Sequence, residues 1–225
     1  MTTPLTGTID EIAAGNAGQV LRFRKLAVLM ANYTDPAITT IVDSTDGTTL
    51  SIAGEYKTVG YLDSQQGGVL TPSMTTSDSM AYGKVQPINE YTTARGLTVA
   101  FTMKESQKTV FEGYYGLDLS AIQAKSTTKE ITWDVPDLPP VFYKRILLLG
   151  QHGDGADAIW GGQFLPRCAL SDIGAQTYSD ADDFVYPVTY KTLTDDAIGT
   201  GQRPFFAGPC LASLGATPLG FTVGA

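Results

Sequence analysis

The chain contains very little cysteine and histidine. Its 225 residues include two cysteines, Cys168 and Cys210, and one histidine, His152. Two cysteines are too few for a disulfide scaffold or a zinc site, so we expect two unpaired, buried thiols in a reducing compartment such as the cytoplasm. A single histidine excludes any mechanism that needs two imidazole groups.

Long apolar runs are also missing. No stretch approaches the roughly 18 consecutive apolar residues of a membrane-spanning helix. Residues 1–16 (MTTPLTGTIDEIAAGN) lack the basic patch and the apolar stretch of a signal peptide. We therefore expect a chain that neither spans a membrane nor is exported, and that has no membrane partner.

Charged residues are scarce, and one sign dominates. They make up 17% of the chain, against about 25% in a typical soluble domain, so threonine, serine and glycine must complete the surface. Lysine and arginine number 15 and aspartate and glutamate 23, which gives a formal net charge of −8. Because nucleic-acid binders need a basic footprint, this balance excludes binding of phosphate along the whole chain.

The motifs of common enzyme classes are absent. There is no Gly-x-Ser-x-Gly, Cys-x-x-Cys or His-Glu-x-x-His, and no phosphate-binding loop with Lys-Ser/Thr. Residues 153–158 match G-x-G-x-x-A and imitate a dinucleotide fingerprint. That motif must open a helix, which Gly161, Gly162 and Pro166 would break. We interpret the stretch as a surface loop.

The residue pattern also gives little support to a calcium site, to a catalytic histidine or to glycoside hydrolysis. Asp154, Asp157 and Asp172 lack the ordering of a calcium loop, and His152 lies in a Gly/Asp-rich turn where a histidine is usually exposed and idle. Sequence spacing leaves paired carboxylates for glycoside chemistry open, but two tryptophans are few for sugar stacking. We expect no enzyme, and no catalytic, cofactor or metal site.

Strand signals dominate the pattern. β-Branched and aromatic residues are spread throughout, and Gly, Pro, Asn or Asp clusters interrupt them every ten or so residues, which predicts a mainly β fold. Pro187 predicts an edge strand or a bulge in its run, because proline cannot donate to a ladder. The expected strands are 21–30, 56–62, 69–75, 83–93, 97–102, 129–135, 142–149, 163–171 and 184–193.

One helix is expected over residues 102–115. Thr102 and Glu105 have capping-box spacing, and Gly116 would end the helix. The helix should bury Val110, Phe111 and Tyr114 against the sheet and leave Lys104, Lys108 and Glu112 outside or at a subunit contact. A shorter candidate begins at Thr8 and ends at Gly15.

Both ends of the chain lack regular periodicity. We interpret residues 1–20 and 197–225 as extended arms flanking one domain, residues 21–196. The second arm is too apolar for a solvated tail, so it should dock either on its own domain or on a neighbouring subunit. The apolar side chains in question are Phe205, Phe206, Leu211, Leu214, Leu219 and Phe221.

Residues 26–196 resemble the major tail (tail tube) proteins of long-tailed, siphovirus-type bacteriophages, particularly those of actinobacteria. The order of features carries the resemblance: GYLD at 60–63, a strand after Gly67-Gly68, two long strands, the amphipathic helix, and KRILLLG at 144–150. PRCA at 166–169, an acidic turn at 180–183 and YPVT at 186–189 resemble the closing strands of that family.

The resemblance implies a β-sandwich or barrel-like domain with one flanking helix. Six copies would close into a ring, and stacked rings would form the tube through which DNA and the tape-measure protein pass. Expected partners are therefore further copies of the chain, the tape-measure protein and other tail proteins, with DNA passing unbound. The protein would be made in the bacterial host cytoplasm and reside in the virion.

The composition agrees with this implication. Few charges suit a protein that is mostly interface, and a wall of the same sign as DNA would form a conduit without adhesion. A different virion β-module, such as a head decoration or adhesin-like domain, is the alternative.

The acidic excess is concentrated in residues 151–225, at Asp154, Asp157, Asp172, Asp180, Asp182, Asp183, Asp195 and Asp196. All lie in turn-like contexts, where a solvated turn is the simplest explanation. The candidates to face the lumen of a tube are Asp154, Asp157, Asp180, Asp182 and Asp183.

Overall fold

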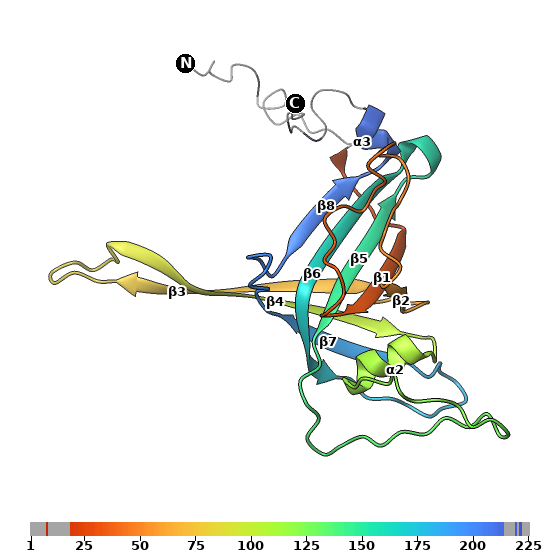
Figure 1. Ribbon diagram of the computed structural model, residues 1–225. Helices are drawn as coiled ribbons and strands as arrows, with labels where there is room; N and C mark the ends of the chain where they lie inside the picture. Colours follow the sequence, from red (N-terminus) through yellow and green to blue (C-terminus); the bar gives the residue numbers. More distant parts are fainter. Residues whose placement is uncertain (1–7, 9–18, 214–218, 220, 222–225) are drawn as a thin grey trace.

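The computed structural model describes residues 8, 19–213, 219 and 221, and its fold is mainly β. Eight strands form one antiparallel sheet, and the described helices are short (Figure 1). The strands are β1 (Lys25–Asn32), β2 (Lys57–Thr58), β3 (Gly68–Ser79), β4 (Asn89–Met103), β5 (Lys144–His152), β6 (Ile159–Ile173), β7 (Tyr186–Thr192) and β8 (Arg203–Ala207). The helices are α2 (Lys108–Tyr115), the 3-10 turn η2 (Gly155–Asp157) and α3 (Pro209–Ser213).

The sheet follows the order β2-β1-β5-β6-β7-β4-β3, with β8 off this path. Strand β6 is 15 residues long, and two different strands pair with the same edge of it. Its first part pairs with β8, from Trp160 to Phe164, and its last part pairs with β7, from Cys168 to Ile173.

Residues 57–63 close the sheet into a barrel. On one side the Val59 amide donates to the Val28 carbonyl of β1 at 3.0 Å. On the other side the Lys104 amide donates to the Tyr61 carbonyl at 2.9 Å, and Leu62 forms a bridge with Met103 at the end of β4. The segment thus joins β1 to β4, which the sheet order keeps apart, and the barrel-like architecture follows.

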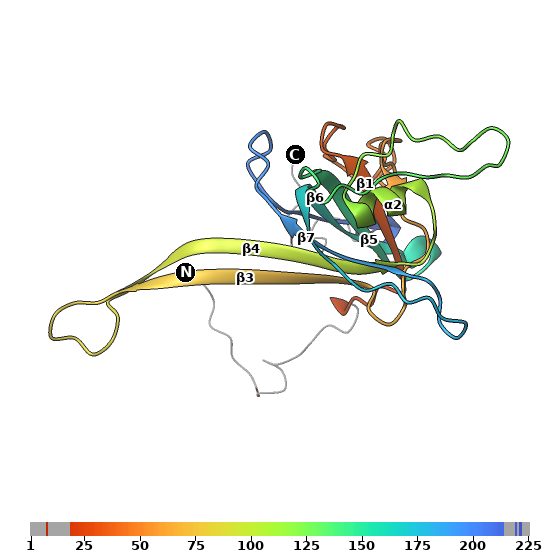
Figure 2. The same cartoon turned by 90° about the horizontal axis from the view of Figure 1, so that it is seen from below.

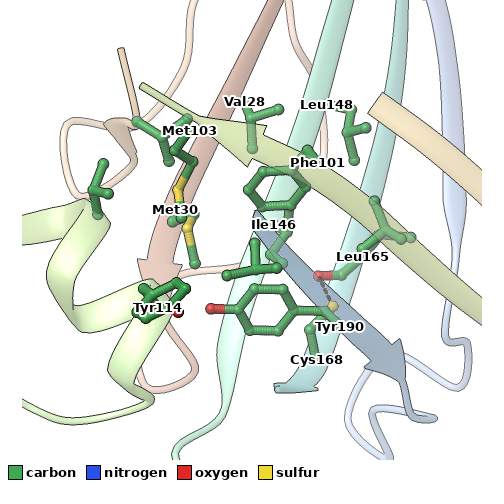
Figure 3. Packing of buried hydrophobic residues seen from close by; sticks show 14 of the residues in the cluster. Val28, Met30, Phe101, Met103, Tyr114, Ile146, Leu148, Leu165, Cys168 and Tyr190 are labelled. Atoms are coloured by element: carbon green, nitrogen blue, oxygen red, sulfur yellow. Dashed lines mark hydrogen bonds between the residues drawn. The ribbon is translucent and has the colours of Figure 1, made fainter. Parts of the chain in front are cut away.

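The main hydrophobic core fills this barrel (Figure 3). Phe101 from β4 and Tyr190 from β7 stack with their ring centroids 6.1 Å apart. Helix α2 covers the barrel near Met30, where the Tyr190 hydroxyl donates to the Gly113 carbonyl at 2.7 Å. Elsewhere on the barrel, the Phe23 ring lies over two glycines that face each other across β5 and β6. Those glycines are Gly150 and Gly161.

A second core lies on the outer face of β1 and β5. On β5, Ile146 and Leu148 point into the barrel, while Leu147 points outward because successive strand side chains alternate. Residues 33–56 cover that outer face and contribute Ile41 and Tyr56. The apolar run of β5 is therefore buried on both faces.

The helix is shorter than its sequence predicts. It spans Lys108–Tyr115, and Thr102 belongs to the end of β4, so the expected capping box does not form; Gln107 is the N-cap and has no side-chain cap bond. Strand pairing with β7 holds Thr102 and outweighs the local capping signal. Gly116 does end the helix, with φ of 65°.

The expected strands differ from the observed ones in four places. The ranges 83–93 and 97–102 merge into β4, apart from a loop before Asn89, because β3 supplies one continuous partner. Residues 129–135 form no strand, and only two residues of 56–62 do. Conversely β8 forms within the range interpreted as an arm, so the sheet extends beyond residue 196.

Pro187 lies neither on an edge strand nor at a bulge of its own strand. Strand β7 is interior, between β6 and β4. Pro187 is its second residue, and the register with β6 runs only as far as Val188. The irregularity lies instead on β6, between Leu170 and Asp172. A missing N–H is tolerated where the ladder ends.

The G-x-G-x-x-A stretch connects β5 to β6 in a hairpin, and its two glycines have different constraints. A Cβ at Gly153 would overlap the Asp157 carbonyl oxygen, whereas one at Gly155 would meet nothing within 4 Å; both residues have positive φ. We expect Gly155→Ala to cost about 1 kcal/mol and Gly153→Ala clearly more, in chemical denaturation. Equal costs would contradict this turn geometry.

Candidate assembly surfaces

A two-stranded arm projects from the barrel (Figure 2). We call residues 72–96 the hairpin arm: the outer parts of β3 and β4 with the loop between them. The threonine- and serine-rich strands pair in register, except for a bulge at which the Thr93 hydroxyl donates to the Thr75 carbonyl at 3.1 Å. The arm reaches well beyond the other strands in both ribbon views.

Within the part of the chain that the structure describes, no third strand pairs with the hairpin arm. Strand β7 pairs with β4 only from Thr98 to Met103, and β3 is the last strand of the sheet. Both outer edges of the arm are therefore open to pairing, and an isolated two-stranded hairpin is marginally stable in water.

Large apolar side chains are exposed on the hairpin arm. Tyr82 is fully exposed, and Val85 is 95% exposed. The others with large exposed fractions are Met74, Met80, Ile88 and Tyr91. Apolar side chains grouped on a projecting element are typical of a surface that another chain covers.

A groove follows the root of the hairpin arm. It has a volume of about 650 Å³ and lies between the open part of β4, at residues 95–97, and residues 192–204. Its lining combines glycines and threonines with the longer polar side chains of Arg95, Gln163 and Gln202. The groove therefore lies along the edge of β4 at the point where β7 ends, beside the Leu97 carbonyl, which accepts from the Thr192 hydroxyl at 3.0 Å.

The acidic lumen candidates form two separate groups. Asp154 and Asp157 lie at the β5–β6 turn, whereas Asp180, Asp182 and Asp183 lie in the loop before β7. These two regions are at opposite ends of β6 (Figure 1). One subunit therefore does not bring all five onto a single patch.

Two of these five carboxylates are paired. The Lys25 ammonium hydrogen-bonds Asp154 and lowers the pKa of that carboxyl. Asp183 accepts from Lys104 at 2.9 Å, and this bond raises the pKa of the lysine. Asp157, Asp180 and Asp182 are exposed and form no ion pair within the described residues.

The apolar residues expected in the C-terminal arm have different surroundings. Phe205 packs in the second core and Phe206 is half exposed, both on β8. Leu211 belongs to α3, and Phe221 is 75% exposed. Residues 203–207 thus dock on their own domain. Leu214, most of residues 1–20 and the helix expected from Thr8 lie outside the described residues.

Two buried ion pairs are the polar features that the sequence interpretation missed. Lys144 bonds Glu112 at 2.9 Å, which corrects the expectation that Glu112 stays outside. Arg145 lies 3.1 Å from Asp195, which is fully buried rather than in a solvated turn. The available signal was the Lys-Arg pair that opens the strongly apolar run of β5.

No reactive constellation is apparent in the described part of the chain. Burial raises the pKa of the Cys168 thiol, which disfavours the thiolate. Among the described residues, no group of three or more His, Cys, Asp or Glu could hold a metal ion. The helices described here include none with the length and apolar character needed to cross a membrane.

Basic side chains gather beside the β5–β6 turn. A hollow of about 440 Å³ lies there. Its lining residues are Arg22, Arg24, Lys25, Gln151, His152, Gly153 and Asp154. The His152 ring nitrogen accepts from the Arg22 amide at 2.9 Å, so the histidine holds the backbone in place.

Comparisons with known proteins add little. No protein-family model matches the chain, and no curated protein matches it either. Among solved structures, one described as "Crystal structure of Hcp protein" is similar over 80% of this chain and 97% of that chain. The identity is 9% and the TM-score 0.29, so the two folds superpose poorly and nothing about function follows from the likeness.

Proposed function

We propose that this protein is a self-assembling structural subunit of a tube, and that the tube is the tail tube of a long-tailed bacteriophage. The observation that carries the proposal is the hairpin arm. It extends from a well-packed barrel, exposes Tyr82, Val85 and their apolar neighbours, and leaves two strand edges open. A second copy of the chain would cover those side chains and edges.

The finer assignment rests on the resemblance of residues 26–196 to major tail proteins. In that arrangement, six copies form a ring, rings stack, and the channel carries DNA and the tape-measure protein. The net charge supports it, since six copies at −8 each carry −48 per ring. A wall of that sign repels DNA phosphates and permits passage without adhesion.

Removing the hairpin arm tests the proposal. Ser73 and Gly96 face each other in the register, so residues 74–95 can be replaced by Asn-Gly, which favours the tight turn of a two-residue hairpin. We expect a folded monomer with an almost unchanged melting temperature that forms no tubes in negative-stain micrographs. The wild-type protein should form stacked rings with a central channel.

A matched pair of variants separates the arm from general surface hydrophobicity. Tyr82→Ser/Val85→Ser should impair assembly, whereas Leu138→Ser/Val141→Ser, which removes apolar side chains exposed elsewhere, should not. Normal tubes from the arm-deleted protein would refute the proposal. Discrete wild-type oligomers without a channel would favour the alternative virion module.

A further inference from the structure

The hollow beside the β5–β6 turn is lined by two arginines, Arg22 and Arg24, that form no ion pair among the described residues. Lys25, by contrast, pairs with Asp154. Both arginines are exposed, and the adjacent Phe23 ring packs over Gly150 and Gly161, which anchors the chain between them. With Lys25 and Asp154, the lining of the hollow carries a net charge of about +2 on a chain that is otherwise acidic.

A complementary protrusion lies at the other end of the barrel. We call residues 179–183 the acidic turn. The rings of Tyr178 and Phe184 contact each other at its base, with centroids 4.7 Å apart, and the Ala181 amide donates to the Ser179 hydroxyl at 3.0 Å. Lys104 holds Asp183. Asp180 and Asp182 remain exposed and without an ion pair among the described residues, and together carry −2.

The acidic turn does not contact the hollow of its own chain. Strand β6 runs between the two regions, from Ile159 beside His152 to Ile173 before the acidic turn. Its 15 residues span roughly 46 Å at about 3.3 Å per residue. Figure 1 places the loop before β7 near α2, at the end of β6 away from the β5–β6 turn. Among the described residues, the acidic turn is therefore out of reach of the hollow of its own chain, and it can meet such a hollow only on another copy.

We propose that the hollow binds the acidic turn of a second copy of this chain, with Arg22 and Arg24 of one copy pairing with Asp180 and Asp182 of the next. Guanidinium groups and carboxylates form paired hydrogen bonds, which set register as well as affinity. Because the two surfaces lie at opposite ends, the contact is head-to-tail, and each added copy exposes a new free end. The inference rests on the proposed self-assembly and assigns Asp180 and Asp182 to a subunit contact instead of the lumen.

Charge reversal tests this contact in the full-length protein. We expect Arg22→Glu/Arg24→Glu, and separately Asp180→Arg/Asp182→Arg, to raise the critical concentration for assembly about tenfold in sedimentation at low salt. The combined four-residue swap restores complementary charges and should return the critical concentration to within about twofold of wild type. Lys57→Glu/Lys191→Glu, which makes the same charge change at exposed sites elsewhere, should leave it unchanged.

The possible outcomes discriminate between the two proposals. If the wild-type protein stays monomeric at every concentration, the proposed function fails and the contact fails with it. If the wild type assembles and either double variant assembles equally well, only the contact is wrong. Loss of assembly in the arginine variant without recovery in the combined swap also overturns the contact, because the hollow would then bind something other than the acidic turn.

Discussion

Replacing Asp195 by alanine is expected to lower the free energy of unfolding by about 3–5 kcal/mol, because it leaves the buried Arg145 without its counter-charge. Asp195 has no exposed surface, and its Oδ2 lies 3.1 Å from Arg145 Nη1. Its other carboxylate oxygen accepts from the Ala197 amide at 3.0 Å and from the Tyr33 hydroxyl at 3.4 Å. Urea denaturation measures the loss.

Two controls identify the cause of that loss. Asp196→Ala removes an exposed carboxylate one residue further along and should change stability by no more than about 0.5 kcal/mol. The double variant Arg145→Met/Asp195→Leu removes both charges and should recover a substantial part of the loss, since an apolar pair can replace a buried ion pair. If the double variant is less stable than Asp195→Ala, the unpaired charge is not the cause.

Replacing Phe101 by alanine is expected to cost about 3–5 kcal/mol, as for other fully buried aromatic residues. Phe101 is 1% exposed at the centre of the barrel, where its ring stacks on Tyr190. The cavity would lie among side chains from several strands, which limits how far the barrel can collapse to fill it. Thermal and urea denaturation both measure the effect.

Two other phenylalanines provide matched comparisons. Phe111 on α2 is only partly buried, although it contacts Trp133 and Tyr186, so Phe111→Ala should cost less than Phe101→Ala. Phe206 on β8 is half exposed, and its replacement should cost least. If Phe111→Ala lowers the free energy of unfolding more than Phe101→Ala does, the most important packing lies at the helix and not at the centre of the barrel.

Local patterns predicted those elements whose side chains alternate or recur with a single period. The run at β5 was recognisable because its apolar residues are continuous, and β7 because Tyr186, Val188 and Tyr190 alternate with exposed or half-buried positions. The helix core was similarly readable, with Val110 and Tyr114 buried and Gly116 at the end. In each case the local preference and the tertiary packing agree.

Expectations from the sequence are wrong where the conformation of a residue depends on a segment far away in the chain. Thr102 has a capping signal, yet pairing with Pro187 of β7 makes it strand. Residues 203–207 show no strand periodicity, yet they pair with an edge of β6 that would otherwise be free and form β8. Asp195 has the sequence context of a solvated turn, but Arg145 lies 50 residues earlier in the chain and meets it in the interior. No local pattern contains such a contact.

By itself the sequence determined the mainly β class, the single main helix and the acidic, charge-poor surface, because composition and side-chain periodicity depend on neighbouring residues alone. Only the tertiary structure decided that residues 57–63 close the barrel, that the outer parts of β3 and β4 project without a third strand, and that Arg22 and Asp180 lie at opposite ends. These properties depend on which strands pair and in which register. Pairing is a relation between segments far apart in the chain, so the packing of the whole domain selects it.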